Sequence, residues 1–193
     1  MKTRCIILLV LVLSISASAQ EQTLMGGTID HGGFGGPMIK VGQIKGEGAI
    51  LVGGRGGWII NHTFVLGGGG YGLVNEIKIK EIGGTNYYLA YGYGGLELEY
   101  IHDSDNLVHY TIHTLFGGGS LNLRTRSFDM DNRQGDLLFI VEPGASIDFN
   151  VTSFFRFGVG ASYTFVSGVN FENLQNSDFG GLSGVITFKF GKF

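Results

Sequence analysis

Apolar side chains recur at every second position through most of this chain, in stretches that end at turn-forming residues. A period of two marks one face of a β-strand, whereas a helix repeats every 3.6 residues. From residue 155 onward, one phase holds Phe155, Phe157 and Val159, and the other holds Arg156 and Gly158. The pattern predicts an all-β chain of eight strands, at 34–43, 48–60, 63–75, 86–101, 107–124, 136–149, 153–167 and 180–192.

The polar phase of these strands is sparse. It consists mostly of Gly, Ser and Thr with isolated charges, and charged residues are 15% of the chain against about 25% in ordinary soluble domains. A soluble barrel turns its apolar face inward and shows water a surface dense in charge, whereas a membrane barrel does the reverse. The composition favours the membrane barrel. A soluble, lipocalin-like ligand-binding barrel is the alternative.

The links between the predicted strands differ in length. Short turns at 61–62, 103–106 and 150–152 alternate with longer links at 77–85, 125–135 and 168–179, and only the link at 44–47 departs from this alternation. Short periplasmic turns and long external loops are typical of outer-membrane barrels. Thirty-five glycines accompany only two prolines, and we expect inward glycines to make room for larger inward side chains such as Arg55, Tyr91 and Tyr93.

The first nineteen residues have the organisation of a secretory signal. A basic start at Lys2 and Arg4 precedes an apolar run that holds Cys5, the only cysteine, and then Ala17-Ser18-Ala19. We expect a signal peptide at 1–19 that is cleaved after Ala19, a short N-terminal periplasmic segment at 20–32 and a barrel at 33–193. No later segment offers about 18 consecutive apolar residues, the length that a membrane-spanning helix requires.

Three features together resemble the small outer-membrane β-barrel proteins of Gram-negative bacteria, of OmpA/OmpX type. They are the Ala17-Ser18-Ala19 site, the eight amphipathic strands and a last strand that ends in Phe193. The resemblance implies an eight-stranded antiparallel up-and-down transmembrane β-barrel in the cell outer membrane. It also implies three kinds of partner: outer-membrane lipids, periplasmic chaperones and the barrel-assembly machinery. That machinery would read Phe193 with Phe190 and Phe188, although Phe193 lies in the opposite phase from the other two.

Six charged residues lie on the inward phase of a membrane barrel. A charge in a narrow lumen is costly unless it is paired, so we expect Arg55 and Arg156 to bind carboxylates. The predicted structural ion-pair network contains Arg55, Glu97, Glu99, Glu142, Asp148 and Arg156. The alternative is a gated ion path or a proton-responsive site, which an interior wide enough only for side chains disfavours.

Catalytic and metal chemistry find little support in the residues. His109 and His113 lie about 13 Å apart along a strand, too far to share a metal ion. The run His102-Asp103-Ser104-Asp105 offers the groups of a hydrolase, but it lies in a short turn, where Asp, Ser and Asn are ordinary turn formers. We expect no catalytic residue, no metal and no cofactor. A lipid-modifying hydrolase is the alternative.

The partners of the protein follow from charge and from the loops. No basic patch indicates nucleic acid. Loops 125–135 and 168–179 mix charged, amide and aromatic residues and would contact an extracellular partner, or they are passive solvated loops. The sequence therefore predicts a non-enzymatic outer-membrane protein with a structural or surface-interaction role.

Overall fold

The computed structural model describes residues 29–126, 135–170 and 174–193. The predicted signal peptide and its cleavage site lie outside the described residues. So do most of the loop at 125–135 and residues 171–173 of the loop at 168–179.

The described chain folds into a closed antiparallel barrel of eight strands, with one further strand at its rim. Neighbouring strands follow the order β3-β2-β1-β9-β8-β7-β6-β5, and β3 pairs with β5 to close the ring. The predicted fold class is confirmed. The elements are β1 His31–Ile44, β2 Glu47–Ile60, β3 Phe64–Leu73, β4 Lys78–Ile82, β5 Thr85–His102, β6 Val108–Arg124, β7 Asp136–Asn150, β8 Phe155–Ser167, the 3₁₀ turn η2 Asn176–Asp178, and β9 Gly181–Lys192.

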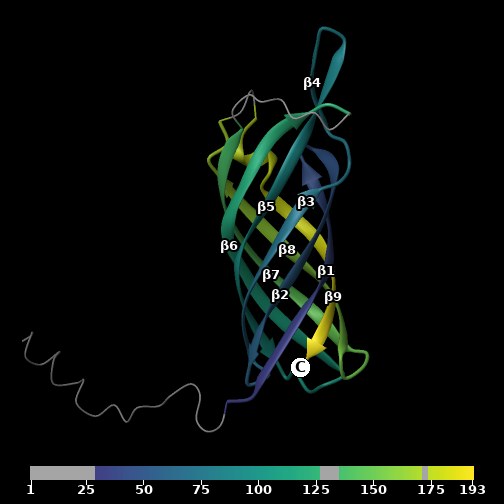
Figure 1. The fold of residues 1–193 in the computed structure, drawn as a ribbon, viewed down its shortest axis with the longest axis vertical. Coiled ribbons are helices and arrows are strands. Elements are labelled where there is room, and N and C mark those ends of the chain that lie inside the picture. Colours follow the sequence, from purple (N-terminus) through teal and green to yellow (C-terminus); the bar gives the residue numbers. More distant parts are fainter. Residues whose placement is uncertain (1–28, 127–134, 171–173) are drawn as a thin grey trace, which may run out of the picture.

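One strand beyond the eight predicted, β4, lies within 77–85, where a link between strands is predicted. It pairs with the start of β5 as a hairpin, from Lys78 opposite Tyr88 to Ile82 opposite Thr85. Gly83 and Gly84 form the turn with φ of 57° and 81°, a left-handed conformation that suits a two-residue hairpin turn. Figure 1 shows this hairpin projecting beyond the rim of the barrel.

The two ends of the barrel differ, as the link lengths indicate. The short-turn end holds the β2–β3, β5–β6 and β7–β8 turns, together with the start of β1 and the end of β9. The long-loop end holds the β4 hairpin and the β6–β7 and β8–β9 links (Figure 1). The β1–β2 link also lies there and is short, as predicted, although the strands extend further than expected and leave only Lys45 and Gly46 between them.

The faces of the strands are those of a membrane barrel. Val159, Tyr163 and Phe165 of β8 are exposed, whereas Arg156 and Ser162 are buried inside. Large exposed apolar side chains surround the other strands too, and most of the buried charges lie on the inward phase of their strands. They are Lys40, Arg55, Glu97, Glu99, Glu142, Asp148, Arg156 and Lys189. An apolar exterior around an ionic interior suits lipid and not water, so the soluble ligand-binding barrel is not the fold observed. In the described part of the chain, no helix has the length and apolar character needed to cross a bilayer.

Candidate functional site: the closed barrel interior

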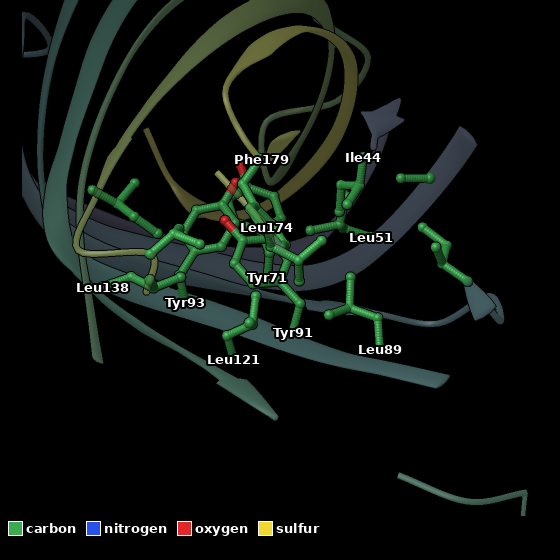
Figure 2. Packing of buried hydrophobic residues seen from close by; sticks show 14 of the residues in the cluster. Ile44, Leu51, Tyr71, Leu89, Tyr91, Tyr93, Leu121, Leu138, Leu174 and Phe179 are labelled. Carbon is green, nitrogen blue, oxygen red and sulfur yellow. The ribbon is translucent and has the colours of Figure 1, made fainter. Parts of the chain in front are cut away.

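The long-loop end of the interior is filled by an apolar plug. Tyr71, Tyr91 and Tyr93 point inward from β3 and β5, and Leu174 and Phe179 from the β8–β9 link close over them (Figure 2). The rings of Tyr91 and Phe179 are 5.2 Å apart between centroids. The plug is fixed to the rim because the backbone N–H of Lys45 donates a hydrogen bond of 2.8 Å to the carbonyl of Asp178.

Below the plug, ion pairs cross the barrel. Arg55 forms salt bridges with Glu97 and Glu99, and Lys189 lies 2.7 Å from Glu99 and 2.8 Å from Asp148. Thr111 and Ser146 also donate hydrogen bonds to Asp148, of 3.0 and 2.8 Å. Charges this deeply buried are tolerated where geometry and additional hydrogen bonds compensate for the loss of water.

A second group of contacts surrounds Glu142. Lys40 forms a salt bridge with this carboxylate, and the Tyr93 hydroxyl donates to it at 2.5 Å while accepting from Lys40 at 2.6 Å. Thr164 donates a further hydrogen bond of 3.1 Å. Lys40 also lies 4.1 Å from the centroid of the Tyr71 ring, a cation–π contact. We call the seven charged residues of both groups the ion belt: Lys40, Arg55, Glu97, Glu99, Glu142, Asp148 and Lys189.

The ion belt separates its two signs by strand. The cations lie on the adjacent strands β9, β1 and β2, whereas the carboxylates lie on β5 and β7. Every pair therefore joins distant parts of the sequence, as Lys40 and Glu142 do across 102 residues. The belt joins strands that are not hydrogen-bonded neighbours, and its pair Lys189–Glu99 spans the full width of the ring.

The short-turn end is closed by a smaller apolar cluster. Phe34, Ile59, Val65 and Ile101 are buried there, and Phe193 packs against them. The ring of Phe193 is stacked on that of Phe34 at 6.3 Å between centroids.

The predicted site residues divide into two sets in the structure. Arg55 forms salt bridges with both Glu97 and Glu99, and Glu142 and Asp148 lie in the same belt with lysines as partners. Arg156 lies apart: its Nη2 donates to the carbonyl and hydroxyl of Ser104, at 3.3 and 3.1 Å, and it makes no salt bridge with a described residue. The carboxylate partner expected for Arg156 is absent within this part of the chain.

Sequence reasoning missed the two lysines of the ion belt. Lys40 follows Ile39 and precedes Val41, both of which face outward, so the period of two already placed it inside. Lys189 lies in the same way between Phe188 and Phe190. The signal was available in the phase of both strands.

The residues considered for catalysis are engaged in other contacts. Ser104 binds Arg156, whereas His102 lies 3.3 Å from Asp103 and stacks on Tyr110. His109 and His113 are buried inside the barrel. Across the described ranges, no cluster of three or more His, Cys, Asp or Glu residues could hold a metal ion.

The three phenylalanines of the expected assembly signal occupy two faces. Phe190 is exposed on the outside and stacks on Phe155 at 4.8 Å, and Phe188 contacts Phe157 on the same surface. Phe193 instead turns toward the interior at the short-turn end. Their reading by the assembly machinery stays a prediction.

The space left inside is small. The cavity beneath Phe179, between Lys40 and Tyr91, has a volume of about 20 Å³, enough for about one water molecule. In the described part of the chain, two apolar clusters and the ion belt occupy the interior. An eight-stranded barrel is just wide enough for side chains to fill it.

No protein-family model and no curated protein matches the chain. Solved structures share its architecture, and among them are the following two. Neisserial surface protein A is 14% identical, with 86% of this chain and 100% of that chain covered and a TM-score of 0.54. The N-terminal β-barrel domain of Pseudomonas aeruginosa OprF is 12% identical, with 83% and 96% covered and a TM-score of 0.51. The closed ring of strands, the apolar exterior and the two similar structures agree. The chain has the transmembrane fold of the small eight-stranded outer-membrane barrels.

Proposed function

We propose that the protein is a non-enzymatic, non-conducting barrel of the outer membrane that makes contacts outside the cell through its long-loop end. The observation that carries this proposal is the hairpin formed by β4 and the start of β5. The ring closes through the pairing of β3 with β5, so β4 is not needed to complete the barrel. An element that extends a barrel past its rim supports a role outside the membrane.

The surface of the hairpin suits recognition of a polar partner. Lys78 and Glu81 are exposed and paired at 2.9 Å, and Ile82 is exposed at the tip. At the base of the hairpin, Arg126 pairs with Glu76 at 3.2 Å. Loops 125–135 and 168–179 arise at the same end and belong to the proposed interaction surface.

Orientation and localisation can be tested by labelling, because the sequence after Cys5 contains no cysteine. Single cysteines at Lys80 and at Asp105 place one thiol on the hairpin and one in a short turn. We expect a membrane-impermeant maleimide to label K80C on intact cells and D105C only after the outer membrane is permeabilised. Labelling of D105C but not K80C on intact cells would reverse the orientation.

The surface role has its own measurement. Cells that display the parent chain are compared with cells that display a variant in which residues 78–86 are replaced by a short Gly-Ser turn, on glass coated with extracellular-matrix extract. Heat-modifiable gel migration confirms that both barrels are folded. Reduced adhesion of the shortened variant supports a surface role, whereas equal adhesion limits the protein to a structural one.

Conduction is tested on the purified protein in planar lipid bilayers. The filled interior predicts no steps above the baseline of the bilayer. Reproducible single-channel openings would contradict the non-conducting part of the proposal.

A further inference from the structure

Arg156 differs from every cation of the ion belt. Lys40, Arg55 and Lys189 each contact a carboxylate, whereas Arg156 has a neutral serine as its hydrogen-bond partner. Its side chain is nonetheless buried, with 5% of the residue exposed. A buried guanidinium without an anion loses hydration that two neutral acceptors replace only in part.

The guanidinium is held in a fixed orientation. Both of its hydrogen bonds to Ser104 come from Nη2, and Cζ lies 4.0 Å from the centroid of the Phe193 ring. Asn150 fixes the turn around this contact, since its Nδ2 donates to the carbonyls of Ser104 and Asn106 at 2.9 and 2.8 Å. The two hydrogen bonds and the cation–π contact restrict the orientation of the guanidinium.

Arg156 lines a cavity of about 330 Å³ at the short-turn end. Besides Arg156, its wall contains the side chains of Ser153 and Thr152, which carry hydroxyls, and the exposed carboxylate of Asp105. The cavity therefore combines one cation, neutral hydroxyl groups and one carboxylate, that of Asp105. It lies at the opposite end of the barrel from the β4 hairpin.

We propose that this cavity is a binding site for a carboxylate. The two oxygens of a carboxylate match the fork of a guanidinium, and the hydroxyls of Ser153 and Thr152 supply further donors. The negative charge of Asp105 disfavours a doubly charged anion such as phosphate. A singly charged group such as the carboxylate end of a small acid or a peptide fits this balance. The inference goes beyond the proposed function and does not depend on which end faces the periplasm.

The test uses the protein in lipid nanodiscs with ¹⁵N-labelled arginine side chains. Acetate and N-acetylglycine are titrated at constant ionic strength while the Nε–H resonances are followed. We expect a saturable shift of the Arg156 resonance with both carboxylates and at least tenfold weaker binding of phosphate. Absence of saturation with both carboxylates, or tighter binding of phosphate, would overturn the proposal.

Variants connect the signal to the cavity. Because R156Q has no Nε–H, acetate binding to the variants is also measured by broadening of the acetate methyl resonance. We expect R156Q to abolish binding, R156K to weaken it about tenfold through loss of the fork, and S153A to weaken it less. R126Q, which removes an exposed arginine at the other end, is the matched control and should leave binding unchanged.

Heat-modifiable gel migration establishes that each variant is folded. If R156Q fails to fold, the binding of acetate to R156K and S153A decides the question. Unchanged binding in those two variants would refute the assignment.

Discussion

Two opposite walls of the barrel place their large side chains on opposite faces, one mainly toward the interior and the other mainly toward the outside. On the wall of β3 and β5, the outward positions at mid-height are glycines such as Gly70 and Gly94, whereas Tyr93 and Glu97 project inward. On the wall of β8 and β9, Phe157 and Phe190 lie outside, and the inward positions include Gly158, Gly160, Ser162 and Thr187. We call the first the glycine wall and the second the aromatic wall.

The difference shows how a narrow barrel is filled. Large side chains from one wall need space on the other, so long residues of β5 face small residues of β8 across the axis. The Tyr93 hydroxyl thus reaches Glu142, to which Thr164 of β8 also donates. Glycine has a local role as well, because a Cβ added at inward Gly144 would lie 2.6 Å from the His113 ring. The expectation that inward glycines accommodate large neighbours is confirmed at this position.

The largest effect is expected where the two walls are joined by charge. Lys189 of the aromatic wall pairs with Glu99 of the glycine wall and with Asp148. K189M leaves two buried carboxylates without this cation and should lower the free energy of unfolding by about 3–5 kcal/mol. Denaturant unfolding in lipid vesicles measures it. K192M, at a lysine whose side chain is 76% exposed, is the control and should change stability by less than about 1 kcal/mol. If K189M and K192M changed stability equally, the buried ion pairs of Lys189 would not contribute to holding the two walls together.

The next effect tests whether both walls face lipid. Val159 lies outside on the aromatic wall and Leu98 outside on the glycine wall. V159R and L98R should each cost about 2–4 kcal/mol near the bilayer midplane, because a charge meets hydrocarbon. The same unfolding assay measures both. A cost confined to V159R would show that the glycine wall is shielded from lipid.

A smaller effect compares one glycine from each wall. A Cβ added at inward Gly158 would collide with the carboxylate of Asp148, whereas one added at Gly72 would have no atom within 4 Å. G158A should destabilise the barrel by about 1–3 kcal/mol, and G72A should stabilise it by up to about 1 kcal/mol. Parallel melting curves decide between them, and the reverse order would contradict the contrast between the walls.

The smallest effect is at the rim beside the glycine wall. A hydrogen bond with His62 at 2.9 Å, followed in importance by the charge of Lys192, lowers the pKa of Asp30 below its ordinary value. A carboxyl group whose pKa is lower in the folded state stabilises the fold at pH values above its unfolded-state pKa, about 3.9. This stabilisation is lost as the pH falls through the folded-state pKa. Wild type and D30N should therefore differ slightly in melting temperature at pH 6, and the difference should vanish as the pH falls below the folded-state pKa of Asp30. A difference that persists at the lower pH would exclude this pair as its source.

Much of the fold could be predicted because the period of two survives in nearly every strand. β4 was missed because its five residues were assigned to a link, although Lys78-Ile79-Lys80 alternates and Gly83-Gly84 is a strong hairpin signal. β3 was the least readable of the barrel strands, since four consecutive glycines from Gly67 remove the contrast between its faces.

The sequence indicated which charged residues face the interior, but not which of them contact one another. Phase alone placed Arg55, Glu97 and Arg156 inside. Which charges meet depends on the register of all the strands between them, and local pattern contains no information about a contact such as Lys189 with Glu99, 90 residues apart. Arg156 shows the consequence, because its position was predicted while the carboxylate expected beside it was not found.

The separation of cations and carboxylates onto different strands bears on how the barrel assembles. Two of the pairs, Lys40 with Glu142 and Lys189 with Glu99, join strands that are three or more positions apart in the sheet. A flat, unrolled sheet would hold these two pairs too far apart for contact. Attraction between the paired charges grows as the sheet curls, and it is greatest once the ring has sealed. We infer that these ion pairs lower the free energy of the closed ring relative to open or partly rolled intermediates.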